Sequence, residues 1–152
     1  MKMKVYLDTS VISALFDERN PERKLLTESF FDQLTNFSPF ISIITIAEIE
    51  RTPSLDLRDR MMRTISIIPV LSPGADVEGL ASQYVDHGAI PDNYREDAYH
   101  ISIAVLNEMD FLLSWNFKHI VKRKTRDIVK MVNTLNRLRQ IEIVTPAELL
   151  ED

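Results

Sequence analysis

The chain has 152 residues, of which 45% are hydrophobic, and this is enough for one domain with a substantial core. It contains no cysteine, so disulfides and thiolate metal ligands are excluded. No apolar run approaches the roughly 20 residues that span a bilayer, and the first apolar run is too short for the core of a secretory signal. We therefore expect a cytoplasmic protein that does not insert into a membrane.

The net charge of −5, taken over the whole chain, argues against a nucleic-acid partner. The distribution is uneven, however, because residues 118–130 carry a charge of +5 and the remaining chain carries −10. Such a run is typical of a solvated helix face, and it equally suits a surface that attracts phosphates. The basic residues of this run are Lys118, Lys122, Arg123, Lys124, Arg126 and Lys130.

In chain order, short apolar runs alternate with segments of helical periodicity. We expect a strand at 5–7, a helix from about 11, a helix from 21 to about 36, a strand at 40–44, a helix around 46–49, a helix at 55–66, a strand at 67–71, a helix at 75–87, a helix at 93–109, a strand at 111–114, a helix at 125–138 and a strand at 141–144. This alternation indicates right-handed crossovers and a parallel sheet with helices on both faces. The predicted fold class is α/β, a three-layer α/β/α sandwich with a central parallel sheet, in a single domain that spans residues 1–152.

Residues with special backbone preferences mark several of these boundaries. Ser10 is expected to cap the first helix, which begins near Val11, because a hydroxyl can accept from an unpaired N–H of the first turn. Pro69 lies inside the third predicted strand and cannot donate a ladder hydrogen bond, which favours an edge position for that strand. Gly88 is expected to end the helix that precedes it.

Three carboxylates differ from the segments that surround them. Asp8 follows the first strand, and open parallel sheets bind ligands at the carboxyl ends of their strands. Glu48 lies among isoleucines, where a charge is costly unless it is paired, and Glu50 points to another face of the helix. Asp97 lies in line with the apolar stripe of its helix, whereas Glu96 lies on the polar side. An exposed position for Glu48 and a helix-dipole role for Asp97 are the alternatives.

Other polar residues are expected near this edge of the sheet. Ser114 and Asn116 follow the fourth strand, where Asn116 either supports a metal or a carboxylate, or caps a short helix at 117–121. His100 is expected at the surface, with a position beside the carboxylates as the alternative. Three carboxylates at one edge repel one another unless a divalent cation joins them, and oxygen ligands suit Mg²⁺ or Mn²⁺. Such a site predicts phosphodiester hydrolysis.

Four segments carry a family resemblance through their order and spacing. They are YLDTSVI at 6–12, IAEIE at 46–50, EDAYHI at 96–101 and LLSWNFKH at 112–119. With them the chain resembles PIN-domain proteins of the group allied to VapC-type toxin ribonucleases, and residues 143–146 are also similar to this group. The resemblance implies a parallel α/β/α sandwich, an Mg²⁺- or Mn²⁺-dependent nuclease that acts mostly on RNA, and a homodimer. For a toxin it also implies a small antitoxin, whose tail fills the active-site groove.

The resemblance further implies roles for individual residues. A hydroxyl beside the first acid arranges the site in this family, and Thr9 or Ser10 matches it, with Ser114 as a further supporting hydroxyl. The implied reaction is in-line attack of a metal-activated water on the phosphorus, which leaves a 5′-phosphate and a 3′-hydroxyl. The residues that match the catalytic positions of the family are Asp8, Glu48, Asp97 and Asn116. The three acids match the metal-binding positions, and Asn116 matches a position that supports the metal through water.

One position departs from the family pattern. Many VapC-type chains have a further aspartate where this chain has His119, which leaves the number of metal ions open and makes His119 a candidate general acid. Flanking phosphates of the RNA are expected to contact the basic side chains around this position. These are Lys118, Lys122, Arg123, Lys124 and Arg126.

Two other classes of function fit parts of the pattern. The first is an RNA-binding or scaffold protein on a PIN fold that has lost turnover. The second is a phosphotransfer domain of receiver or haloacid dehalogenase type, which also uses an aspartate after its first strand. A dehalogenase needs a second aspartate where Ser10 stands, and a receiver domain needs a further acidic pair, so a metal ligand is the better prediction for Asp8.

Overall fold

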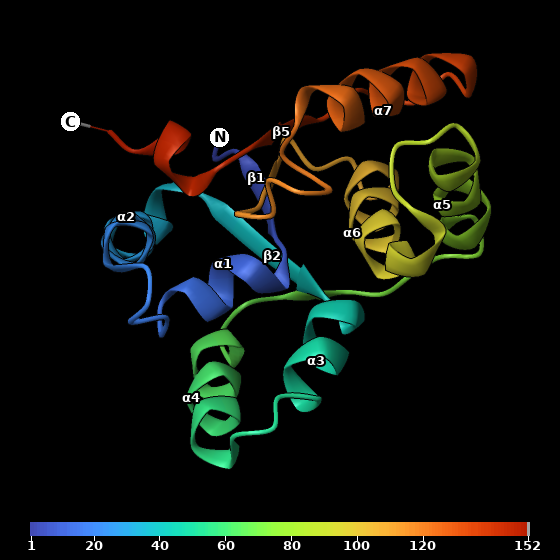
Figure 1. The fold of residues 1–152 in the computed structure, drawn as a ribbon. Coiled ribbons are helices and arrows are strands. Elements are labelled where there is room, and N and C mark those ends of the chain that lie inside the picture. Colours follow the sequence, from blue (N-terminus) through green and yellow to red (C-terminus); the bar gives the residue numbers. More distant parts are fainter. Residues whose placement is uncertain (152) are drawn as a thin grey trace.

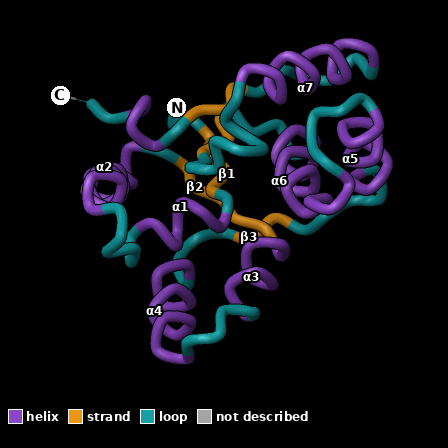
Figure 2. The backbone as a smooth tube through the Cα atoms, viewed as in Figure 1, coloured by secondary structure: helices purple, strands orange, loops and turns teal. Residues whose placement is uncertain are grey.

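The computed structural model describes residues 1–151, which form three layers with a parallel sheet between two sets of helices (Figure 1, Figure 2). The five strands are hydrogen-bonded in the order β3-β2-β1-β4-β5. Their bounds are β1 Lys4–Leu7, β2 Ser38–Ser42, β3 Val70–Leu71, β4 Phe111–Leu113 and β5 Glu142–Val144. The predicted α/β/α sandwich with a central parallel sheet is therefore confirmed.

Helices cover both faces of this sheet. In Figure 1, α1, α2 and α4 lie on one side of the strands, and α5, α6 and α7 lie on the other, with α3 directly after β2. No helix of residues 1–151 is long and apolar enough to cross a membrane. The helices are α1 Thr9–Ala14, α2 Pro21–Asp32, α3 Ile43–Glu50, α4 Leu55–Ile65, α5 Val77–Asp86, α6 Arg95–Leu106 and α7 Arg123–Leu135, with short 3-10 turns η1 Leu34–Asn36, η2 Asp92–Tyr94 and η3 Pro146–Leu149.

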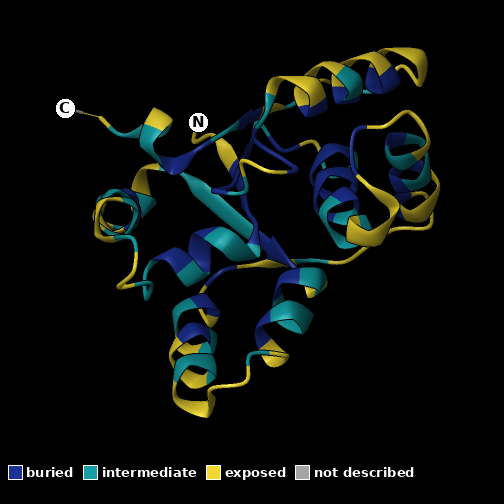
Figure 3. Ribbon diagram, viewed as in Figure 1, coloured by how far each residue is buried: buried dark blue, intermediate teal, exposed yellow. Residues whose placement is uncertain are grey.

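The central strand β1 shows how the sheet divides the core into two. Tyr6 packs in the cluster formed with α5, α6 and α7, whereas Val5 and Leu7 pack in the cluster formed with α1, α2 and α4. All three side chains are fully buried, whereas β2 begins with half-buried residues (Figure 3). Successive side chains of a strand point to opposite faces, so a strand that is covered on both faces is apolar throughout.

The cap of α1 differs from the expectation. Asp8, and not Ser10, is the N-cap, and its carboxylate accepts a hydrogen bond from the Val11 N–H at 3.3 Å. The helix therefore begins at Thr9, and Ser10 lies within its first turn. A carboxylate caps a helix as well as a hydroxyl does, and the sequence pattern could not separate the two.

The strands β2 and β3 are also displaced from the expected ranges. β2 begins at Ser38 and includes Pro39, whereas β3 contains only Val70 and Leu71. Pro69 has no N–H to donate, but its carbonyl accepts from the Ile41 N–H at 3.0 Å, just before β3. The predicted edge position of this strand is confirmed.

The end of α5 agrees with its local signal, whereas two later helix boundaries differ from the expectation. Gly88 adopts a φ of +87° and follows α5, and the N–H of Ala89 donates to the Tyr84 carbonyl at 2.9 Å, as in a Schellman cap. α6 begins at Arg95, later than expected, because a 3-10 turn occupies the residues before it. The expected short helix at 117–121 is replaced by turns.

Candidate functional site

The sheet has a topological switch point between β1 and β4. These strands are neighbours, but β2 and β3 lie beyond β1 while β5 lies beyond β4. Open α/β sheets form their ligand crevice where the strand order reverses, outside the carboxyl ends. Asp8 follows β1, Ser114 follows β4, and the Asp8 N–H donates to the Leu113 carbonyl at 3.2 Å. The topology therefore places both residues at the position where this fold class binds ligands.

Asp8 is an almost fully buried acid, 3% exposed. Its Oδ1 accepts from Ser10 Oγ at 2.5 Å, and its Oδ2 accepts from Ser114 Oγ at 2.5 Å. Burial raises the pKa of Asp8, and the charge of His100 together with these hydrogen bonds offsets this in part. The direct partners of this carboxylate are hydroxyls and a backbone N–H rather than a cation.

The loop after β4 orients the two hydroxyls that bind Asp8. The Trp115 N–H donates to Ser10 Oγ at 2.8 Å, and the Asn116 N–H donates to Ser114 Oγ at 2.9 Å. Each serine therefore accepts from the backbone and donates to the acid. This arrangement fixes the carboxylate on both sides and explains the supporting positions of Ser10 and Ser114.

The helix α3 brings Glu48 to the same edge. The Ser42 side chain at the end of β2 caps α3 by accepting from the Ile44 N–H at 3.2 Å, so the helix starts directly at the carboxyl end of the strand. The side chain of Glu48 is 23% exposed, whereas Glu50 points to solvent, as expected. Oε1 of Glu48 accepts from Thr9 Oγ1 at 2.6 Å. Thr9 is adjacent to Asp8 in the chain, so this bond links the first two acids.

His100 is buried, and the expectation of a surface position is wrong. Its Nε2 lies 2.6 Å from Glu48 Oε1, and its Nδ1 lies 2.5 Å from the hydroxyl of Tyr6. That hydroxyl lies 2.7 Å from Ser42 Oγ. The reason for burial is that α6 is covered on nearly all sides, since residue 98 and residues 100–105 are all buried.

The contact between His100 and Glu48 changes the ionisation of both groups. Burial opposes a charge on either side chain. For His100, the effects of Tyr6, Glu48 and Asp8 outweigh burial and raise the pKa well above its ordinary value. For Glu48, the hydrogen bond and charge of His100 outweigh burial and lower the pKa. Both shifts favour the same state of the pair, an imidazolium that faces a carboxylate.

Asp97, in the first turn of α6, is the third acid at this edge of the sheet. Its Oδ2 accepts from Asn116 Nδ2 at 3.3 Å and lies 3.1 Å from His119 Nδ1. Oδ1 of Asn116 accepts from the His119 N–H at 2.9 Å, so Asn116 both orients the carboxylate and closes its own turn. Burial raises the pKa of Asp97 against the opposing effects of His100 and His119, and the charge of Glu48 raises it further.

Hydrogen bonds through Ser114 and Asn116 thus connect Asp8 to Asp97, and Thr9, next to Asp8 in the chain, connects it to Glu48. The oxygens of these three acids suit a hard cation. Both bonds to Glu48 end on Oε1 and both bonds to Asp97 end on Oδ2, so within residues 1–151 Oε2 of Glu48 and Oδ1 of Asp97 have no hydrogen-bond partner. No three His, Asp or Glu side chains among these residues already surround one point. The donor set fits Mg²⁺ or Mn²⁺ by its chemistry. To bind one ion together, the carboxylates must turn toward one another.

The basic residues predicted to bind phosphates lie beside this edge and at the start of α7. Lys118 is exposed in the loop that contains Asn116, and Lys122 is the N-cap residue of α7. The N-terminus of a helix attracts phosphate through its free N–H groups and its dipole. The exposed basic side chains of the first turns of α7 are Arg123, Lys124 and Arg126, and Asp127 is exposed beside them.

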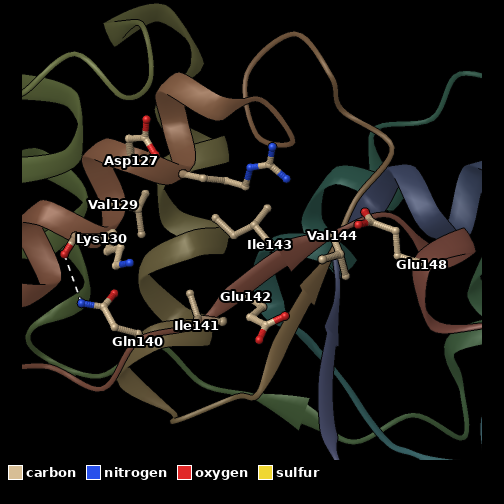
Figure 4. Close-up of a pocket in the computed structure, with 10 residues that line it drawn as sticks. Asp127, Val129, Lys130, Gln140, Ile141, Glu142, Ile143, Val144 and Glu148 are labelled. Atoms are coloured by element: carbon tan, nitrogen blue, oxygen red, sulfur yellow. Dashed lines mark hydrogen bonds between the residues drawn. The ribbon is translucent and has the colours of Figure 1, made fainter.

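A cavity of about 440 Å³ lies along α7 and β5, away from the acids (Figure 4). Asp8, Glu48 and Asp97 do not line it. Its charged lining residues are Arg126, Asp127, Lys130, Glu142 and Glu148, and these carry both signs. The cavity therefore contains none of the three acids at the carboxyl edge of the sheet, and the chemistry is assigned to the switch point instead.

Sequence reasoning missed the buried contacts that hold Glu48. Tyr6, Ser42 and His100 form this support, and none of them was predicted to do so. Two weak signals were present: a single tyrosine in an otherwise aliphatic strand, and a histidine three residues after Asp97 on the same helix. Neither signal identifies its partner, because the partners come from three separate segments of the chain.

Comparisons with known proteins find the fold but no relative in sequence. No protein-family model matches the chain, and no curated protein matches it significantly. A chain of VapBC2 from Rickettsia felis, bound to a DNA fragment from their promoter, is 13% identical, with a TM-score of 0.60 over 93% of this chain and 97% of that chain. VapC20 of Mycobacterium tuberculosis, a Sarcin-Ricin loop cleaving toxin, is 15% identical, with a TM-score of 0.58 over 76% of this chain and 92% of that chain. The protein therefore has the fold of VapC toxins, and the resemblance to PIN-domain proteins is confirmed at the level of the fold.

Proposed function

We propose that this protein is an Mg²⁺- or Mn²⁺-dependent endoribonuclease, the toxin of a toxin–antitoxin pair. The observation that carries the proposal is the hydrogen-bonded set of Asp8, Glu48 and Asp97 at the switch point of a VapC-like fold. Two of these three carboxylates have a raised pKa because of burial. A divalent cation is the group that would stabilise their charged forms and also bind a phosphodiester.

The residues that would hold the ion are Asp8, Glu48 and Asp97, with Asn116 beside them. When bound there, Mg²⁺ or Mn²⁺ supplies charge stabilisation for the phosphate and a water of lowered pKa. Ser10 and Ser114 keep Asp8 in one orientation, so the reorganisation that binding of one shared ion requires falls on Glu48 and Asp97. Preorganised ligands of this kind raise the rate because their ordering has already occurred on folding.

The two histidines act on the acids rather than as ligands in this proposal. His100 keeps Glu48 ionised and fixed through Oε1, which leaves Oε2 for a ligand. His119 and Asn116 fix Asp97 through Oδ2, which leaves Oδ1 for a ligand. The basic residues from Lys118 to Arg126 would neutralise phosphates on either side of the scissile bond.

A small antitoxin and a second copy of the chain are the proposed protein partners. The similarity to a chain of VapBC2 supports an antitoxin, because the resemblance to VapC-type toxins implies one. An antitoxin is expected to reduce cleavage by covering the acidic edge. The alternative, an RNA-binding PIN fold without turnover, predicts binding of RNA that survives EDTA and no cleavage under any metal.

The function is tested by incubating the purified protein with a structured RNA pool in Mg²⁺ or Mn²⁺ and sequencing the 5′ ends of the fragments. We expect cleavage that EDTA abolishes and that leaves 5′-phosphates. Glu48→Gln and Asp97→Asn are expected to lower kcat by about 100-fold or more, in line with the loss of a charge that stabilises a transition state.

The chain offers a matched control for each of these variants. Glu50 lies on α3 but is exposed, and Glu96 is next to Asp97 but pairs with Arg51 at 2.7 Å. Glu50→Gln and Glu96→Gln should therefore cleave at the rate of the wild type. Equal losses in all four variants, or cleavage that persists in Glu48→Gln, would contradict the assignment.

A further inference from the structure

Two exposed aromatic rings lie beside residues that contact Asp97. Tyr94 is 46% exposed and precedes α6 by one residue, and Phe117 is 50% exposed and follows Asn116. Single exposed apolar residues are ordinary on a protein surface. These two differ because each is held by other side chains of the site and each has a cation at its ring.

The ring of Tyr94 packs on His119, the residue that contacts Asp97. The two ring centroids are 4.1 Å apart at an interplanar angle of 43°, and His119 is buried. Nζ of Lys118 lies 5.9 Å from the centroid of Tyr94, within the range of a cation–π contact. One side of the Tyr94 ring is therefore supported by a fixed group of the site, while almost half of the residue remains open to solvent.

The ring of Phe117 is held in a similar way on the other side of the loop. Its centroid lies 6.2 Å from that of Trp115, which is buried and donates from Nε1 to Thr27 Oγ1 at 2.9 Å. The guanidinium of Arg23 lies 5.6 Å from the Phe117 ring and 5.2 Å from the Trp115 ring. Arg23 comes from α2, so two distant segments of the chain build this position.

The combination of open aromatic rings and adjacent cations matches one chemical class of ligand. Bases of single-stranded nucleic acid stack on exposed rings, and nearby Lys or Arg neutralises the phosphates between them. In a duplex the bases are already stacked on each other and cannot reach such rings. Tyr94 packs on His119 and Phe117 follows Asn116, and both His119 and Asn116 contact Asp97, so a stacked base would lie beside the acidic edge.

We propose that Tyr94 and Phe117 are base-stacking positions for single-stranded RNA, with Lys118 and Arg23 as their phosphate contacts. This inference rests on the proposed function, which it deepens by naming two side chains that would bind the bases of the substrate. The acids and their metal would cleave the backbone, and the two rings would hold unpaired bases beside them.

The test measures binding in EDTA, where no cleavage occurs, with a short single-stranded RNA that carries 2-aminopurine. Stacking of this base on a ring quenches its fluorescence. The leucine variants Tyr94→Leu and Phe117→Leu keep an apolar side chain of similar size but remove the ring. Each is expected to lose the quenching and to weaken binding about five- to 100-fold, the range for loss of one base–aromatic stack. Tyr94→Phe and Phe117→Trp should retain both.

Controls separate stacking from folding and from charge. Ile67→Ala, at a position 83% exposed and outside this site, should bind as the wild type does. Arg23→Ala should weaken binding and also reduce its dependence on salt, because a phosphate contact releases counterions and a stacking contact does not. Both rings are about half exposed, so the leucine variants should unfold at the temperature of the wild type.

The outcomes distinguish this inference from the proposed function. If the wild type binds and quenches the RNA but never cleaves it, the nuclease proposal fails and the stacking positions stand. If the wild type cleaves and both leucine variants bind within twofold of it, the stacking positions are refuted and the nuclease stands. Equal affinity for duplex and single-stranded RNA would also overturn the inference, as would leucine variants that lose binding to a protein partner but none to RNA.

Discussion

The substitution Tyr6→Phe tests whether the buried contacts behind Glu48 are needed for function. Tyr6 is fully buried, and its hydroxyl contacts His100 Nδ1 at 2.5 Å and Ser42 Oγ at 2.7 Å. Removing the oxygen leaves Nδ1 without a partner, whereas Ser42 keeps its bond from the Ile44 N–H. His100 can then rotate or shift, and Glu48 loses its fixed orientation.

The expected loss of stability follows from the number of buried polar groups that Tyr6→Phe leaves without a partner. Leaving one buried polar group without a partner costs about 1–3 kcal/mol, so we expect the free energy of unfolding to fall by about 2 kcal/mol. For a chain of this length each kcal/mol lowers Tm by about 2–4 °C, which predicts a decrease of about 4–8 °C. Displacement of a positioned group lowers activity steeply, and we expect kcat to fall about tenfold or more.

A second buried tyrosine provides the matched control. Tyr84 is also fully buried, and its hydroxyl donates to Asn133 Oδ1 at 2.5 Å, between α5 and α7 and away from the acids. Nδ2 of Asn133 already has no partner within residues 1–151. Tyr84→Phe should therefore destabilise the protein by a similar amount without changing kcat.

The assay is urea unfolding, followed by cleavage rates at a temperature where both variants are folded. Tyr6→Phe should lower the unfolding midpoint at an unchanged m value, and it should lower kcat. The reasoning is refuted if Tyr6→Phe unfolds with the wild type, or if Tyr84→Phe loses as much activity as Tyr6→Phe does.

Two further predictions concern ionisation. Burial raises the pKa of Asp8, so its charged form costs stability as pH rises from the ordinary value of about 3.9 through the raised pKa. In EDTA, Asp8→Asn should therefore gain stability relative to the wild type over this pH interval. A difference in stability that is constant with pH would contradict this. Added Mn²⁺ should raise the Tm of the wild type but not that of the variant. The Lys4 N–H, with Arg139, lowers the pKa of Asp110, so its contribution is present above the ordinary pKa and is lost as pH falls through the lowered value. By urea unfolding, the wild type should be more stable than Asp110→Asn at pH 6, and this difference in the free energy of unfolding should disappear below about pH 4. A difference that persists at lower pH would refute the role of this carboxylate.

The sequence by itself determined the fold class, because local patterns encode it. Apolar runs such as Val5–Leu7 must be covered on both faces, and their alternation with helical segments leaves a parallel sheet between helices as the arrangement that buries them. Gly88 and Pro69 marked a helix end and an edge strand for the same local reason, since each restricts the backbone at its own position. Glu48 and Asp97 stood out because a charge in an apolar context has a cost that is visible in the sequence, and Asp8 stood out because it follows the first strand.

Only the tertiary structure decided which groups meet. The order β3-β2-β1-β4-β5 brings Ser114 to Asp8, although 106 residues separate them, and no local pattern records that distance. His100 was expected at the surface because its own helix does not show how completely its neighbours cover it. Its bonds to Tyr6 and Glu48 join segments that are adjacent solely in space. Propensity and periodicity are properties of neighbours in the chain, whereas the support of a buried acid depends on the packing of the whole fold.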